Sequence, residues 1–222
     1  MFQEEVLKGD KLYDAIVAAV VNYEPKTILE IGSGNGKGST KAFIEGVYKA
    51  EIQDSCRMCC LEARPERFID LKDIMANHSF VNCLCASSVP LEEYMTEADV
   101  VDFMRRHGPN LKISQYSTET VLGWRTQEIA GILDTGFPQN GIEYARSLAG
   151  VEEFDMVFID GSAFSGFAEY SRVFNSPTLI IDDTEDIKGF HIMADVRREN
   201  TYGILMEDKE YRNGFAVLRN DI

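Results

Sequence analysis

Short runs of apolar residues alternate with longer amphipathic segments along most of the chain. The runs predict strands at 27–31, 57–61, 80–85, 154–159, 178–181, 204–207 and 215–219. The helical spacing of apolar positions predicts helices at 12–20, 37–50, 65–77, 166–173 and 187–199. Continuous apolar strands that alternate with helices are typical of a parallel sheet with both faces covered. We therefore predict an α/β fold, a Rossmann-like, doubly wound, mostly parallel seven-stranded sheet with an antiparallel C-terminal hairpin.

One segment is too long for this plan, because strands and helices of such folds are usually joined by only a few residues. Residues 89–152 separate the third predicted strand from the fourth. Apolar stripes within them predict helices at 91–101, 121–133 and 142–149. We predict a single domain, 1–222, in which 89–152 form a helical insertion. Long insertions of this kind often serve as lids or substrate loops.

A glycine-rich turn follows the first strand, in the sequence TILEIGSGNGKGST at 27–40. A phosphate-binding P-loop would need Ser or Thr after Gly36-Lys37, but Gly38 stands there. A dinucleotide fingerprint would need a third glycine where Lys37 stands. What remains is Glu30-x-Gly-x-Gly-x-Gly. The carboxylate inside this motif would repel a pyrophosphate and suits an ammonium group.

This motif resembles the first motif of the class I S-adenosylmethionine (SAM)-dependent methyltransferases. The resemblance implies that SAM is the cofactor and that Glu30 helps to hold its amino group. The residues expected beneath its methionine part are Gly32, Ser33, Gly34 and Gly36. Glu62, at the end of the second strand, is expected to accept hydrogen bonds from the ribose hydroxyls. Ala86 and Ser87 occupy the third motif, where the usual acid is missing and the Ser87 hydroxyl is expected to bind the adenine.

Acidic residues end the fourth and fifth strands. Asp160 lies in FDMVFIDGSAF and Asp182-Asp183 in TLIIDDTEDIKGF, which resemble the fourth and fifth motifs of the same family. The resemblance places Asp160 beside the methyl sulfonium. Because ligands of such sheets bind at the carboxyl ends of the strands, we expect the three acids to converge. Two interpretations stay open: they hold Mg²⁺ or another divalent cation, or they cap helices and orient loops without metal.

The candidate general bases are these three acids and His191, whose unperturbed pKa lies near neutrality. The segment 114–147 resembles methyltransferase domains that accompany glycosyltransferases in surface-glycan assembly. That resemblance implies a sugar hydroxyl as acceptor, for example on a deoxyhexose such as rhamnose, and glycosyltransferases as partners. Tyr116 and Trp124 are the candidate platform for a sugar ring, although burial is the commoner fate of a tryptophan.

Composition narrows the function further. The net charge of −15 disfavours nucleic acid and anionic lipid as partners. No apolar run reaches the length of a membrane span and no signal peptide is apparent, so we expect a soluble, cytoplasmic protein. The five cysteines lie in or beside predicted core strands and are expected to be free thiols instead of zinc ligands. We predict a SAM-dependent O-methyltransferase; the alternatives are a SAM-binding scaffold without catalysis and an NAD-dependent oxidoreductase.

Overall fold

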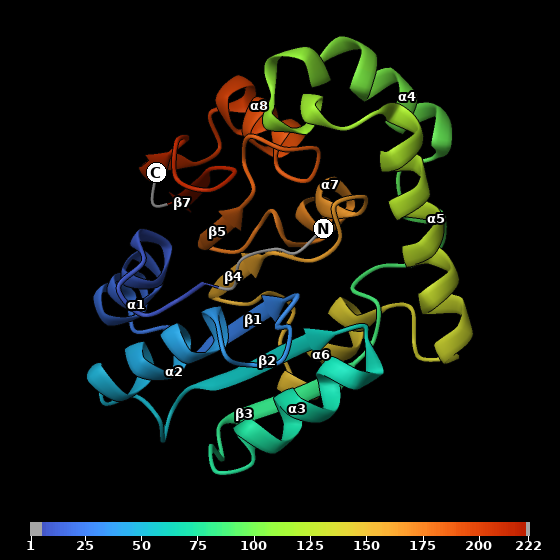
Figure 1. The fold of residues 1–222 in the computed structure, drawn as a ribbon. Helices are drawn as coiled ribbons and strands as arrows, with labels where there is room; N and C mark the ends of the chain where they lie inside the picture. Colours follow the sequence, from blue (N-terminus) through green and yellow to red (C-terminus); the bar gives the residue numbers. More distant parts are fainter. Residues whose placement is uncertain (1–5, 221–222) are drawn as a thin grey trace.

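The computed structural model describes residues 6–220, which form an α/β structure around one central sheet (Figure 1). Within these residues the sheet has seven strands in the order β3-β2-β1-β4-β5-β7-β6. The strands are β1 (Thr27–Ile31), β2 (Arg57–Glu62), β3 (Val81–Cys85), β4 (Met156–Ile159), β5 (Thr178–Asp182), β6 (Gly203–Asp208) and β7 (Phe215–Arg219). The first five are parallel, and β7 is antiparallel to both β5 and β6. The predicted fold class is confirmed.

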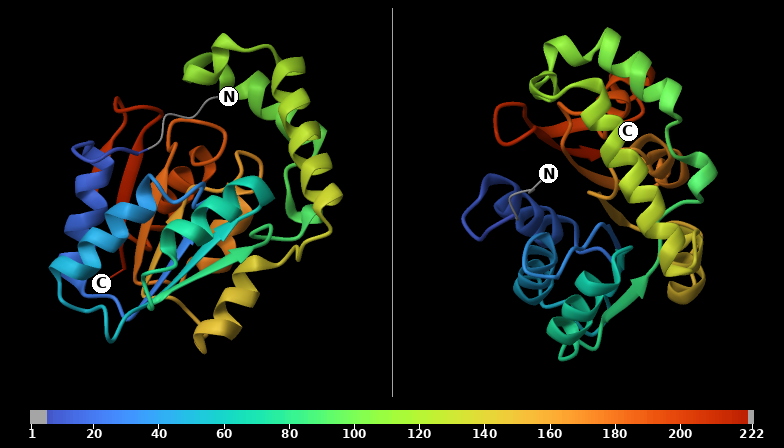
Figure 2. Two further views of the ribbon diagram at one scale, coloured as in Figure 1. Left: turned by 60° about the horizontal axis from the view of Figure 1, so that its bottom comes forward. Right: turned by 45° about the vertical axis from the view of Figure 1, so that its right-hand side comes forward.

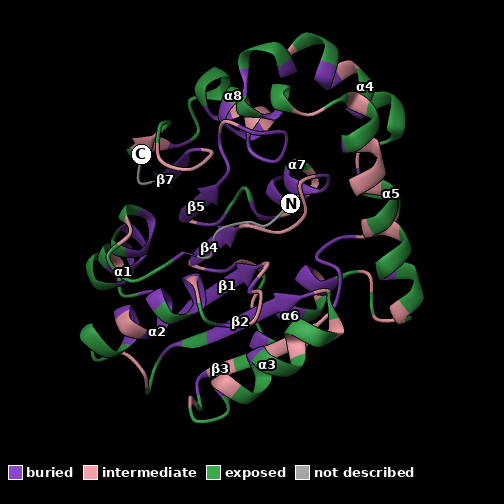
Figure 3. Cartoon of the chain, in the orientation of Figure 1, coloured by how far each residue is buried: buried purple, intermediate pink, exposed green. Residues whose placement is uncertain are grey.

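Helices cover both faces of the sheet. One face carries α1 (Lys11–Tyr23), α2 (Ser39–Lys49) and α3 (Pro65–Met75), and the other carries α6 (Gly141–Ala149), α7 (Gly166–Val173) and α8 (Phe190–Glu199). Because successive side chains of a strand point to opposite faces, Ile28 of β1 packs in one hydrophobic cluster and Leu29 in the other. All five residues of β1 are buried, which explains the apolar side chains on both of its faces (Figure 3).

The insertion begins differently from the prediction. The expected helix at 91–101 is a short 3₁₀ turn, η1 (Leu91–Glu93), followed by α4 (Glu97–Arg106). The helix starts later because Thr96 caps it: the Thr96 hydroxyl accepts a hydrogen bond from the Asp99 N–H, and the Asp99 carboxylate accepts one from the Thr96 N–H. Two more 3₁₀ turns, η2 (Gly108–Asn110) and η3 (Lys112–Gln115), lead to α5 (Thr118–Thr135).

Helices α4 and α5 form an arc along one side of the molecule (Figures 1 and 2). The third helix expected in the insertion, α6, belongs instead to the layer that covers the sheet. Arg57 Nη1 of β2 donates a hydrogen bond to the carbonyl of Ala149 at 3.0 Å, and the Gly141 N–H donates to the carbonyl of Ser87 at 2.8 Å. The carboxyl ends of β1 and β2 point toward α5, so the arc faces the edge where ligands of such sheets bind.

Candidate functional site

The glycine turn after β1 is held tightly against the ends of β2 and β4. Gly32 has a φ of 85°, and a Cβ atom on it would lie 2.0 Å from the carbonyl oxygen of Asp160. The N–H groups of Gly32 and Ser33 both donate to the carbonyl of Leu61, at 3.0 and 2.9 Å. Gly34 and Gly36 also have positive φ, of 58° and 80°. Only glycine satisfies both the backbone angle and the close approach at position 32.

Glu30 lies beneath this turn and is fully buried. Its carboxylate accepts hydrogen bonds from the Ser39 hydroxyl at 2.7 Å and the Thr40 hydroxyl at 2.8 Å. Burial raises the pKa of the Glu30 carboxyl, and these hydroxyl groups oppose that shift. Glu30 therefore ties the first turn of α2 to β1; its contact with a cofactor amino group stays a prediction.

We expect Thr40→Val to lower the free energy of unfolding by about 1–3 kcal/mol, because it leaves one oxygen of a buried carboxylate without its donor. The measurement is denaturant unfolding. Ser171→Ala is the control, since its exposed hydroxyl donates only to the backbone carbonyl of Phe167. Equal stability of the two variants would contradict the anchoring role of Glu30.

Glu62 connects the glycine turn to the start of α3. The side chain is 6% exposed, and Oε1 accepts a hydrogen bond from the Arg64 N–H at 2.8 Å. Burial raises the pKa of the Glu62 carboxyl, against the effects of the Arg64 and Gly34 N–H groups and the Arg67 guanidinium. The predicted ribose ligand is therefore beside the predicted turn. Ala86 and Ser87 are also buried at this edge, but the Ser87 hydroxyl already donates to the carbonyl of Val89 at 2.9 Å.

The three predicted acids come together at the ends of β4 and β5. One carboxylate oxygen from each of Asp160, Asp182 and Asp183 lies within 4.8 Å of the others. Asp182 and Asp183 are buried, and the Asp160 side chain is 14% exposed. Their convergence is confirmed, because parallel strands place their carboxyl ends at one edge.

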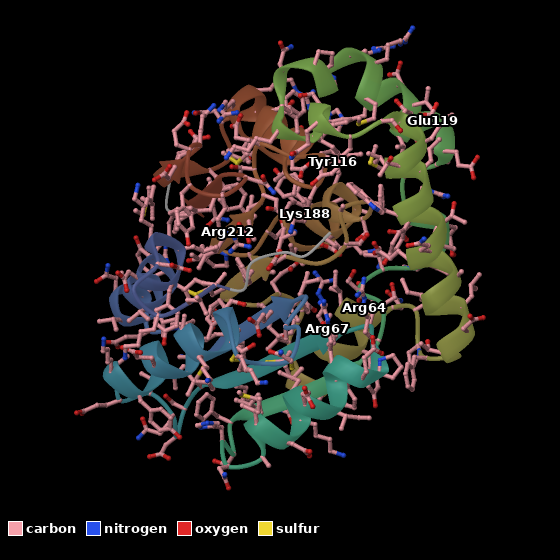
Figure 4. The ribbon with its side chains drawn as sticks, in the orientation of Figure 1. Arg64, Arg67, Tyr116, Glu119, Lys188 and Arg212 are labelled. Atoms are coloured by element: carbon pink, nitrogen blue, oxygen red, sulfur yellow. The ribbon has the colours of Figure 1, made fainter. Side chains whose placement is uncertain are left out.

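Two cations that the sequence reasoning missed balance these acids. Lys188 Nζ lies 2.5 Å from Asp160 Oδ1 and 2.8 Å from Asp183 Oδ2. Arg212 Nη2 lies 3.3 Å from Asp182 Oδ2. Burial would lower the pKa of Lys188, but Asp160 and Asp183 outweigh it and the pKa is raised. Figure 4 shows Lys188 and Arg212 from one side of the site, and Arg64 and Arg67 from the start of α3, directed toward the central space.

The pKa values of the acids follow from burial and from these cations. Burial and the neighbouring Asp183 and Asp160 raise the pKa of Asp182. Burial also raises the pKa of Asp160, against the effect of Lys188. Burial alone would raise the pKa of Asp183, but Lys188 and Arg212 outweigh it and hold the pKa below its usual value. The edge thus contains buried charges that compensate one another.

The acids have the spacing of a metal site, but the surrounding residues do not fit a divalent cation. The Lys188 ammonium already lies within hydrogen-bond distance of two of the three candidate ligands. A divalent ion would have to share this space with a positive charge, which repels it. The predicted metal role of Asp160, Asp182 and Asp183 is therefore not supported.

The structure does not bring His191 to the acids. Its ring packs against Phe103, His107, Phe167 and Phe190, with centroid distances of 5.5, 5.7, 6.4 and 5.5 Å. His191, Phe103, His107 and Phe167 border a pocket of about 630 Å³ between α4, α7 and α8. Burial and the neighbouring His107 lower the pKa of His191. Its role as a general base stays a prediction that no contact with the acids supports.

The insertion contributes three side chains near the site. Tyr116 and Trp124, the predicted sugar platform, are half-buried and form an edge-to-face pair with centroids 4.7 Å apart. Glu128 of α5, which the sequence reasoning missed, lies where the Ser162 side chain, Arg64 and Lys188 act on its carboxyl group. Burial raises the pKa of the Glu128 carboxyl, against the effects of those three residues. Helix α5 therefore places a carboxylate near Ser162, Arg64 and Lys188, which follow β4, β2 and β5.

No family model and no curated protein matches the chain. The O-methyltransferase from Bacillus cereus in complex with SAH is 13% identical, with a TM-score of 0.53 over 94% of this chain and 80% of that one. SAH-bound methyltransferase PaMTH1 from Podospora anserina is 13% identical, with a TM-score of 0.52 over 95% and 78%. A methyltransferase from Geobacter sulfurreducens is 9% identical, with a TM-score of 0.53 over 96% and 80%. At these identities the likeness shows a shared fold.

Two further predictions from the sequence concern the cysteines and membrane-spanning segments. The five cysteines form no disulfide within the described residues; Cys56, Cys59 and Cys60 are buried, whereas Cys83 and Cys85 are only partly buried. None of the helices within residues 6–220 combines the length and the apolar character needed to cross a bilayer.

Proposed function

We propose that this protein is a SAM-dependent O-methyltransferase that acts on a hydroxyl group of a small acceptor, most specifically a sugar of a glycan. The observation that carries the proposal is the meeting of two groups of residues at one sheet edge. The glycine turn and Glu62 follow β1 and β2, and Asp160 with its partners follows β4 and β5. The fold shared with SAH-bound methyltransferases supports this assignment of the edge.

The polar groups around the turn fit the cofactor. The turn offers bare backbone for close approach, and Glu62 offers a carboxylate that suits two adjacent ribose hydroxyls. The acids Glu62 and Asp160 favour a positively charged ligand at this edge. When bound, SAM supplies a methyl group activated by its positive sulfur. Acidic side chains around the turn also disfavour the pyrophosphate of NAD, which is the oxidoreductase alternative.

The chain would then have to align an acceptor hydroxyl and remove its proton. Most of the rate enhancement should come from holding the acceptor oxygen in line with the methyl carbon. Asp160 Oδ1 accepts a hydrogen bond from Lys188, and the Asp160 side chain is 14% exposed. We propose the Asp160 carboxylate as the proton acceptor and Glu128, across the same space, as the second candidate.

The acceptor site would lie beneath the insertion. The edge-to-face pair of Tyr116 and Trp124 provides an apolar ring surface of the kind that pyranose faces pack against. This pair is the support for a sugar acceptor, for example a deoxyhexose. The proposed glycosyltransferase partners rest only on the sequence resemblance of the segment 114–147.

The test is SAM binding by calorimetry together with mass-spectrometric detection of methyl transfer to a panel of glycosides. Formation of S-adenosylhomocysteine together with a methylated glycoside would establish the proposal. SAM binding without turnover across the panel would favour the scaffold alternative, and NAD binding without SAM binding would contradict the proposal.

Glu62→Gln should weaken SAM binding about 10- to 100-fold, because a hydrogen bond to a charged group is worth about 1.5–3 kcal/mol. Glu66→Gln is the matched control, since Glu66 is an exposed acid in the first turn of α3, the helix that follows Glu62, and its loss should leave affinity unchanged. Equal affinities of the two variants would show that Glu62 is not the ribose ligand.

A further inference from the structure

Lys188 is buried beside the three acids at the ends of β4 and β5. Its side chain is 2% exposed. A Cβ atom on Gly166, at the start of α7, would lie 2.5 Å from the Lys188 carbonyl oxygen and 2.8 Å from its Cγ. The absence of a side chain at position 166 therefore lets α7 pack closely over the lysine. A buried lysine with close backbone on one side and carboxylates on the other is fixed in its position.

The Lys188 ammonium and the surrounding carboxylates hold one another in position. Asp160 Oδ1 and Asp183 Oδ2 are bound by the same Nζ atom, and Asp183 Oδ1 accepts a second hydrogen bond from Asn213 Nδ2 at 3.1 Å. Arg212 lies beside the third acid, Asp182. Carboxylates packed this closely repel one another unless a cation lies between them. In a metal-dependent site a divalent ion, with oxygen ligands at about 2.0–2.6 Å, would fill that role.

We infer that Lys188 is the resident cation of this edge: its ammonium takes the position that a divalent ion would occupy, holds Asp160 in place, and lets the site act without divalent metal. Lys188 is thus a positioning residue. The inference rests on the proposed function only where methyl transfer is the readout. Its metal-binding consequence holds whatever reaction the protein catalyses.

The first experiment measures Mn²⁺ binding to the whole chain by the electron paramagnetic resonance signal of the free ion. Wild-type protein should show no site that depends on Asp183. Lys188→Ala should create one such site, with affinity at least tenfold above wild type, and Mn²⁺ should raise the unfolding midpoint of this variant alone. Adding Asp183→Asn to Lys188→Ala should remove the site.

Lys209→Ala is the matched control, because Lys209 is a half-exposed lysine that pairs with Glu185 and Glu207 outside the cluster. It should bind Mn²⁺ as wild type does. A tight wild-type site that Asp183→Asn removes would overturn the inference, as would Lys188→Ala binding no more tightly than wild type. Lys188→Met serves the same comparison if the alanine variant does not fold.

The second experiment adds a chelator to the methyl-transfer assay with wild-type protein. Turnover should stay within twofold, and a loss of more than tenfold that Mg²⁺ restores would overturn the inference. A protein with no turnover under any condition would contradict the proposed function, while the Mn²⁺ titration would still decide the role of Lys188.

Discussion

Gly32→Ala should abolish detectable SAM binding. The new Cβ atom would lie 2.0 Å from the Asp160 carbonyl oxygen and 2.6 Å from its carbonyl carbon, at a φ of 85° that alanine rarely adopts. The backbone cannot move aside freely, because the Gly32 N–H is bonded to Leu61 and the Asp160 N–H to Ile31. Overpacking and backbone strain together cost about 2–6 kcal/mol. Calorimetric titration with SAM and denaturant unfolding would measure this loss in binding and in stability.

Gly136→Ala separates the cost of the backbone angle from the cost of the collision. Gly136 ends α5 with a φ of 62°, and a Cβ atom there would have no neighbour within 4 Å. We expect a loss of about 1 kcal/mol of stability and unchanged SAM affinity. If Gly32→Ala bound SAM as well as this control, the turn would not be the cofactor site.

The sheet was predictable because each of its elements is specified locally. The expected bounds of β1 match the observed Thr27–Ile31, since a strand buried on both faces carries apolar residues on both, here Ile28, Leu29 and Ile31. The start of α4 was misplaced because apolar spacing alone extends the helix back to Leu91. The Thr96–Asp99 capping box, a polar signal, sets the true start.

The site was predictable only in part, for a related reason. Asp160, Asp182 and Asp183 directly follow parallel strands, so topology alone brings them together. Lys188 lies in a loop and Arg212 between β6 and β7, and charged residues in such places are mostly exposed. Their burial follows from packing over a longer range, such as the approach of Gly166 to Lys188. Lys188 follows Asp183 by five residues, but this spacing alone does not predict an ion pair between them.

Asp160→Asn should reduce turnover at saturating SAM about 10²- to 10⁴-fold, the usual contribution of a positioned general base. An asparagine oxygen can still accept the hydrogen bond from Lys188, so the enclosure of the ammonium should persist. The base must be deprotonated to act, and burial raises the pKa of Asp160. The wild-type rate should therefore fall as pH drops through this raised pKa, and Asp160→Asn should lose that limb of the kcat profile.

Glu128→Gln decides between the two carboxylates that face the acceptor space. An amide has nearly the shape of a carboxylate, so both variants remove a negative charge near Lys188 and conserve shape. If Asp160 is the base, Glu128→Gln should change KM more than kcat and keep the acidic limb. The reverse pattern would transfer the role to Glu128. Because Glu128 belongs to the insertion and Asp160 follows a strand of the sheet, that reversal would place the catalytic base on α5.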